Sequence, residues 1–290
     1  MDWALLGAGV LQMLLVPFLG GWRWKLVLSA MRAEGRIWPL SRLFWIGLLF
    51  SQVLPSSAGG DVARVYMMWR GGTSLRVAFN SVALERASML ITLIAFVALL
   101  MPVLASRVIV AELAWVAPAL LIASVVGLVV LMSADRFLKH LPDMRVVRAI
   151  AGLSADARRV YLSGFGWRLI AVCLVTLVNG SVAAWWMGLA LGLPLGLADY
   201  LVFIPVIAIV TLVPVSVGGW GVREGALVAL LGLVGIPSHM ALAFSVLFGF
   251  VGIVASLPAF GFLWSAPSAA KPNDCPADLL KFAADSSEVS

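Results

Sequence analysis

The residues of this chain that could bind a charged ligand belong to a motif that occurs twice, Pro-x-Ser-x-Gly-Gly-x-x-x-Arg. The two copies consist of Pro55, Ser57, Gly59, Gly60 and Arg64, and of Pro214, Ser216, Gly218, Gly219 and Arg223. Because proline removes a backbone donor and glycine permits unusual φ and ψ angles, each copy is expected to open a helix inside strongly apolar surroundings. In membrane transporters, such interrupted segments at matching positions in two halves indicate a binding site where the halves meet.

A Gly-Gly pair followed by a helix start presents free N–H groups and the positive end of a helix dipole, and both favour an anion. An arginine one turn into the helix can form two parallel hydrogen bonds with a phosphate group. Asp61 could instead serve only as the N-cap of a helix over 61–70. The predicted site for a lipid headgroup contains Ser57, Gly59, Gly60, Asp61, Arg64, Glu85, Arg86, Ser216, Gly218, Gly219, Arg223 and Glu224.

Two interpretations of the charges inside apolar segments stay open. Each charge costs about 2.5–3.5 kcal/mol at a helix centre, so it should face a cavity or a partner. Adjacent helical residues point about 100° apart, so neither Glu85-Arg86 nor Arg223-Glu224 is expected to pair internally. We expect Glu85 to pair with Arg64 or Arg223, and Glu224 to pair with Arg86. In the alternative interpretation, these charges only lock helices together.

Signatures of several enzyme classes are absent from the sequence. It contains no P-loop for nucleotide hydrolysis, no Gly-x-Ser-x-Gly and no His-Glu-x-x-His. Cys173 and Cys275 do not make a disulfide framework, and His140 and His239 are too few and too far apart for a metal cluster. We therefore expect no catalytic residue, no metal, no cofactor and no enzymatic activity.

The composition indicates the elements that must position this site. Hydrophobic residues make up 62% of the 290 residues and charged residues 12%, and the mean hydropathy is +1.06. A soluble domain averages about 25% charged residues, so the sequence predicts an all-α polytopic membrane protein. Long apolar segments cover 3–21, 76–104, 113–132, 167–191 and 239–264, and shorter ones cover 43–54, 60–70, 198–213 and 221–235. A basic loop is predicted over 133–166, and a disordered cytoplasmic tail over 265–290.

The distribution of lysine and arginine predicts the topology. Basic residues cluster in 21–42 and 133–168, and positive segments near span ends stay in the cytoplasm. This rule is met if 43–70 and 198–235 are broken, re-entrant hairpins that enter from opposite faces among about five full spans. That arrangement is an inverted repeat. In the alternative topology, each short piece is a complete span, and the pieces are joined by a Gly/Pro turn.

The motif residues also resemble a known family. The runs over 54–64 and 214–224, with Glu85-Arg86 and Arg23-Trp24, are similar to the flippase-like family of the transmembrane region of bacterial lysylphosphatidylglycerol synthase. The resemblance extends over nearly all of a predicted transmembrane domain of residues 1–264. It implies movement of a polar or modified lipid between leaflets without an ATPase. The aminoacyltransferase domain of the synthase is missing here, so no aminoacylation is expected.

The leading prediction is a multi-pass protein of the bacterial inner membrane that binds and translocates a polar or phosphate-bearing lipid. Its expected partners are an anionic or modified phospholipid, a hopanoid or a glycolipid, and a lipid-synthesising enzyme, but no nucleic acid. One alternative is a non-transporting, lipid-binding accessory subunit of a glycosyltransferase or lipid-modifying enzyme. The remaining alternative is an enzyme that acts on a polyprenyl-phosphate sugar.

Overall fold

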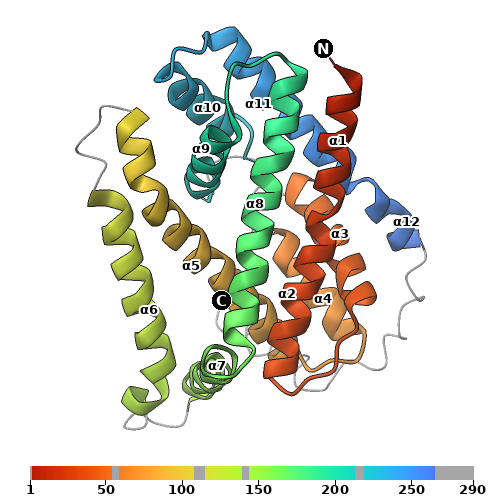
Figure 1. Cartoon of the computed structure of the whole chain (residues 1–290). Coiled ribbons are helices and arrows are strands. Elements are labelled where there is room, and N and C mark those ends of the chain that lie inside the picture. The colour runs from red at the N-terminus through yellow and green to blue at the C-terminus, as the bar shows by residue number, and fades with distance from the viewer. Residues whose placement is uncertain (1, 54–58, 108–114, 139–143, 213–218, 265–290) are drawn as a thin grey trace, which may run out of the picture.

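The computed structural model describes residues 2–53, 59–107, 115–138, 144–212 and 219–264. Within these ranges the long regular elements are all α-helices and no strand occurs (Figure 1). The helices are α1 (Trp3–Leu14), α2 (Val16–Ala30), α3 (Ile37–Val53), α4 (Gly59–Arg70), α5 (Leu75–Arg107), α6 (Val116–Leu138), α7 (Arg145–Leu162), α8 (Gly166–Ala190), α9 (Leu197–Val210), α10 (Val222–Gly232), α11 (Ser238–Ser256) and α12 (Pro258–Trp264).

Five helical segments are long and apolar enough to cross a membrane. They are Trp3–Ala30, Leu75–Leu100, Pro118–Phe137, Gly166–Ala190 and Ser238–Trp264. The first joins α1 to α2 and the last joins α11 to α12. The predicted all-α polytopic membrane fold is therefore confirmed.

The predicted span over 3–21 is wrong at its C-terminal end, because the helical segment continues to Ala30. Arg23 lies inside this segment and is buried. A partner carboxylate on α5 compensates its charge, and the apolar run from Leu26 to Ala30 continues the span. A basic residue therefore did not mark the end of the helix.

The helices of the two predicted hairpins form two pairs, α3 with α4 and α9 with α10. Helices α3 and α4 pack closely, because a Cβ added to Gly60 would lie 2.2 Å from the carbonyl oxygen of Gly47. Helices α9 and α10 also contact each other. In Figure 1, α9 and α10 lie toward the upper end of the bundle, and α3 and α4 lie toward its lower end. This arrangement agrees with an inverted repeat, and re-entry from opposite membrane faces stays a prediction.

The predicted basic loop over 133–166 is wrong as a loop. Helix α6 continues to Leu138, and α7 covers Arg145–Leu162. Buried residues Ala157 and Val160 share one face of α7 with the half-buried Leu153, which packs against the same core. A helix with one apolar stripe and one basic face can form where the sequence appears only basic.

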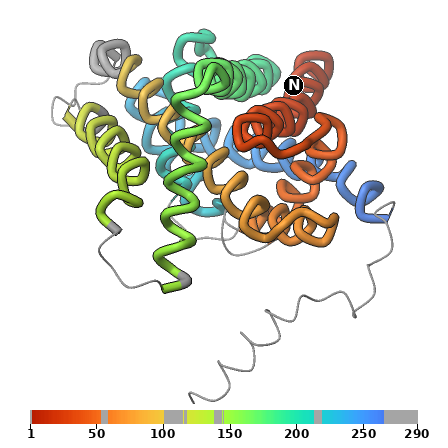
Figure 2. The backbone as a smooth tube through the Cα atoms, turned by 90° about the horizontal axis from the view of Figure 1, so that it is seen from below, coloured from red at the N-terminus to blue at the C-terminus, as the bar shows by residue number. Residues whose placement is uncertain are grey.

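Helix α7 lies across the end of the bundle. It is seen end-on in Figure 1, where α8 runs lengthwise from the top of the picture to the bottom, and it is seen lengthwise in Figure 2. Helix α8 lies at the centre and packs against α1, α2, α5 and α9. An amphipathic helix perpendicular to spanning neighbours is suited to the membrane surface.

Candidate functional site

The centre of the candidate site is Glu85, a fully buried carboxylate on α5. Its Oε1 atom lies 2.7 Å from Nη2 of Arg23 on α2, and its Oε2 atom lies 2.9 Å from Nη2 of Arg64 on α4. Both arginines are also buried, at 4% and 2% exposure. Helices α2, α4 and α5 are thus joined through one carboxylate.

Two aromatic rings fix the guanidinium of Arg64. Its Cζ atom lies 4.5 Å from the ring centroid of Trp24 and 4.5 Å from that of Phe44. The Trp24 ring is itself held by a 2.9 Å hydrogen bond that its Nε1 donates to Ser81 Oγ. Stacking on aromatic faces favours arginine over lysine at this position.

A second acid extends the cluster toward the surface. Oδ1 of Asp61 accepts a 3.0 Å hydrogen bond from Arg64, and Oδ2 lies 2.6 Å from Nε of Arg86. The Arg86 side chain is 44% exposed, whereas Glu85 is inaccessible. We call Arg23, Asp61, Arg64, Glu85 and Arg86 the ion network.

The second motif carries a smaller cluster at the start of α10. Glu224 lies 2.8 Å from Nη2 of Arg223, accepts a 3.2 Å hydrogen bond from Ser245 and accepts another from the backbone N–H of Gly221. The Arg223 guanidinium stacks 4.7 Å from the Trp220 centroid. Glu224 therefore caps α10 and also neutralises its neighbour.

Helix α11 brings the two motifs toward each other. A Cβ added to Gly249 would lie 2.1 Å from Nη2 of Arg223, and one added to Gly252 would lie 3.5 Å from Nε2 of Gln52. Gly249 and Gly252 are less than one helical turn apart, about 4.5 Å along the axis. The end of α3, which leads into the first motif, thus lies next to the second motif.

The predicted pairing of Glu85 with Arg64 is confirmed, but the pairing of Glu224 with Arg86 is wrong. Arg86 pairs with Asp61 instead, and Glu224 pairs with the adjacent Arg223. The expectation that neighbours on one helix cannot pair fails for Arg223 and Glu224, because long side chains can bend toward each other at a helix start. The Glu85-Arg86 doublet does not pair internally.

The remaining predicted residues are an acid in the first turn of α4, glycines that the backbone geometry requires, and residues outside the described ranges. Asp61 is not an N-cap, because α4 begins at Gly59 and Asp61 lies in its first turn. Gly60 is required by the close approach of α3, and Gly219 adopts a φ of +80°. Outside the described residues lie Ser57, Ser216, Gly218 and the tail over 265–290.

Arg23 is the central residue that the predicted site omitted. It was grouped with the basic residues that end the first span, although it belongs to the ion network. Two signals pointed to it: Arg23-Trp24 is part of the family resemblance, and the apolar residues that follow, including Leu26, Val27 and Leu28, indicate that the helix continues past a buried charge. In the described part of the chain, no group of three His, Cys, Asp or Glu side chains could hold a metal ion.

These features define an all-α polytopic membrane protein whose broken helices surround buried ion pairs. Residues 1–259 match the family model described as the lysylphosphatidylglycerol synthase TM region, and the chain belongs to that family. Membership places it among lipid-related membrane proteins. Neither a curated protein nor a solved structure shows a detectable match to this chain.

Proposed function

We propose that the protein binds and translocates a polar or phosphate-bearing lipid between the leaflets of the bacterial inner membrane, and that the ion network recognises the headgroup. The observation that carries this proposal is an excess of positive charge. The network contains three arginines and two carboxylates. Buried charges require partners, so an anionic headgroup would complete the set.

An unsatisfied donor supports the same proposal. Nε of Arg64 is buried and has no hydrogen-bond partner among the described residues. Leaving a buried donor unpaired costs about 1–3 kcal/mol, and more for a charged group. A phosphate oxygen would satisfy this donor and balance the excess charge at the same time.

The described conformation is the closed one in this proposal. Arg64 is 2% exposed, so a headgroup reaches it only when the α3/α4 pair moves relative to α5. Arg86, at the exposed edge, makes the first contact. Asp61, which bonds both arginines in this conformation, then releases Arg64 and keeps Arg86 as the headgroup enters. The proposal includes no chemical step, so the protein acts as a transporter and not as an enzyme.

Transfer of a fluorescent phosphatidylglycerol by purified variants in liposomes tests the proposal. We expect Arg64→Ala to lower the transfer rate about tenfold or more, since a charge-assisted hydrogen bond is lost. Arg64→Lys keeps the charge without the paired donors, so its rate should be intermediate. Arg223→Ala should also slow transfer. Arg70→Ala, at the other end of α4, is the matched control and should transfer normally.

Thermal stability in detergent, measured for the same variants, separates binding from folding. If Arg64→Ala unfolds the protein but its folded fraction transfers lipid at the normal rate, the arginines only lock helices together. The proposed function would then be wrong.

A further inference from the structure

A groove lies between α3, the end of α4 and α12, apart from the ion network. Its volume is about 400 Å³, and its apolar lining consists of Leu40, Leu43, Ile46, Met67, Met68 and Phe262. Leu40, Ile46 and Met68 are buried, and the other three side chains are half-buried. We call this feature the apolar groove. A groove with such a lining accepts the apolar face of an amphipathic helix, and methionines adapt their shape to the helix that binds.

The rim of the apolar groove carries a free cation. Arg36, in the connection from α2 to α3, is exposed and forms no ion pair with any described residue. Arg42 also lines the groove, and its Cζ atom lies 5.1 Å from the ring centroid of Phe262. The groove therefore suits an occupant that has an apolar face and an acidic edge.

The sequence that follows α12 contains a segment with this pattern. Over 276–285, Leu279, Phe282 and Ala283 recur at spacings of three and four residues, so they share one face of a helix. The opposite face carries the charged residues Asp278, Lys281 and Asp285. Over 274–290, acidic residues outnumber the single lysine. A helix of this length is marginal in water by itself, so it needs a partner for its apolar face.

The position of α12 brings this segment to the groove. Trp45 Nε1 donates a 3.0 Å hydrogen bond to the carbonyl oxygen of Ala255, and the Phe262 ring lies 5.4 Å from the Trp45 ring. These contacts fix α12 on α3, with Phe262 in the lining of the groove. An extended chain over 265–275 reaches about 35 Å, which is enough to place 276–285 in the groove. The positive-inside rule assigns the connection from α2 to α3 to the cytoplasm, where the tail is also expected.

We propose that the apolar groove is the docking site for residues 276–285 of the same chain. Leu279 and Phe282 pack against the groove wall that contains Leu43 and Met67, and the acidic edge of the segment contacts Arg36. The docked segment joins α12 to the adjoining ends of α3 and α4. This inference does not depend on the proposed translocation, because it concerns only a contact within the chain.

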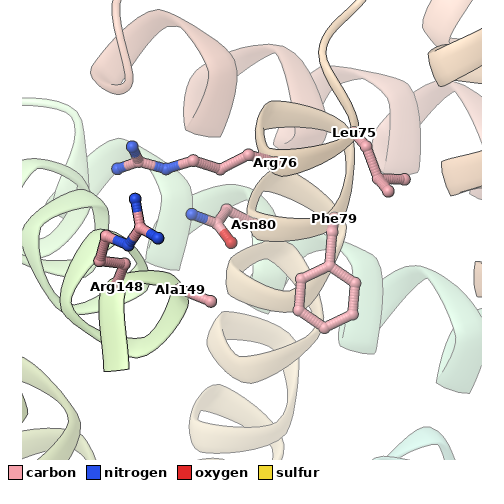
Figure 3. A pocket seen from close by; sticks show the side chains of 6 residues that line it. All are labelled: Leu75, Arg76, Phe79, Asn80, Arg148 and Ala149. Atoms are coloured by element: carbon pink, nitrogen blue, oxygen red, sulfur yellow. The ribbon is translucent and has the colours of Figure 1, made fainter. Parts of the chain in front are cut away.

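Another cavity at the same end of the bundle provides a matched control. It lies between α5 and α7, and its lining includes Arg76, Asn80, Arg148 and Ala149 (Figure 3). Asn80 donates a 2.8 Å hydrogen bond to Asp156, and Arg76 lies 3.9 Å from the same carboxylate. Arg148 also has an interaction partner. Because these polar side chains are already engaged, we do not expect the acidic segment to dock there.

Disulfide formation within the full chain in membrane vesicles tests the docking. In a Cys275→Ser background, Ala283→Cys is combined with Met67→Cys, and the linked peptides are identified by mass. We expect this disulfide to form about tenfold or more faster than one between Ala283→Cys and Ala149→Cys, because docking raises the effective concentration of the segment at the groove. Leu43→Cys provides a second pair with the same expectation. Cys173 is buried and should not react.

Substitutions in the segment distinguish docking from chance collision. Leu279→Asp places a charge on the apolar face and should slow the disulfide about tenfold or more. Val289→Asp adds the same charge outside the segment and should leave the rate unchanged. Size-exclusion profiles confirm that each variant is folded. Equal rates for the groove pairs and the Ala149→Cys pair, or an unchanged rate in the Leu279→Asp protein, would overturn the proposal. A disulfide that links two chains would show that a second copy occupies the groove, and would also overturn it.

Discussion

At the residue scale, Glu85 has a different role from the arginines that surround it. It is the shared partner of Arg23 and Arg64, and all three side chains are buried. Either arginine can lose its contact and Glu85 still keeps one partner. Loss of Glu85 leaves two buried positive charges next to each other, so its effect on folding should be the largest.

We expect Glu85→Gln to lower the free energy of unfolding by about 3–5 kcal/mol, because it breaks a buried ion pair on one side. Thermal unfolding in detergent measures the change. Glu34→Gln removes a carboxylate from an exposed position and should change stability by less than about 0.5 kcal/mol. Equal stability of the two variants would show that the network does not hold α2, α4 and α5 together.

At the element scale, the close packing of α3 on α4 positions the first motif. Gly47 and Gly60 allow this approach, because a Cβ on Gly60 would also lie 2.1 Å from Ser51 Oγ. The backbone of one helix therefore contacts the backbone of the other, which is typical of small residues at helix interfaces in membranes. The place of Arg64 beside Glu85 depends on this contact.

Gly60→Ala is expected to destabilise the protein by about 1–3 kcal/mol through overpacking against the backbone of α3. Gly180→Ala is the matched control, since it lies in the spanning helix α8 and its added Cβ would meet nothing within 4 Å. Unfolding in detergent compares the two variants. A Gly60→Ala protein as stable as Gly180→Ala would show that α3 and α4 can separate without cost.

Helix α7 is connected to the helix that carries Glu85. The Tyr161 hydroxyl lies 3.0 Å from Ser88 Oγ and 3.4 Å from the carbonyl oxygen of Leu84. Burial raises the pKa of this phenol, so the group remains a neutral donor. Leu84 directly precedes Glu85, so movement of α7 would be transmitted to the ion network.

Tyr161→Phe should weaken this connection by about 0.5–1.5 kcal/mol, the usual net value of one hydrogen bond. Hydrogen exchange should become faster in α7 first. Tyr66→Phe removes a hydroxyl from a half-exposed ring on α4 and should leave exchange in α7 unchanged. Unaltered exchange in the Tyr161→Phe protein would show that apolar packing alone holds α7.

At the scale of the whole molecule, the basic residues gather at one end. The C-terminal end of α2 and the whole of α7 lie toward the lower end of the bundle in Figure 1, and the turn from α10 to α11 lies at the upper end. Both basic regions are thus on the same side, as the positive-inside rule requires. We expect that side to face the cytoplasm.

Labelling with a membrane-impermeant maleimide tests this orientation in cells whose outer barrier has been opened. Met144→Cys, before α7, and the natural Cys275 should stay unlabelled until the inner membrane is disrupted. Leu233→Cys, at the turn between α10 and α11, should be labelled at once. The buried Cys173 should contribute no background. Immediate labelling of Met144→Cys would reverse the predicted orientation.

The sequence alone determined the class of protein and the positions at which its helices are interrupted. A chain with 62% hydrophobic residues must satisfy its backbone groups in helices when it crosses lipid. The positions of proline and glycine marked both short helix pairs, and the rarity of charge within apolar segments limited the expected partners of Glu85 to Arg64 or Arg223. Each of these signals lies in a short segment of the sequence, or follows from the free-energy cost of placing one charged residue in lipid.

The tertiary structure decided which charges meet. The spacing of residues along the chain gives no information about the rotation of α2 against α5, so Arg23 looked like the end of a span although it pairs with Glu85. Similarly, the basic region that forms α7 showed only its charge, because its apolar stripe gains stability only by packing against α2, α5, α6 and α8. A residue's type limits the partners that it can have, but only the packing of helices determines which of them lies within reach.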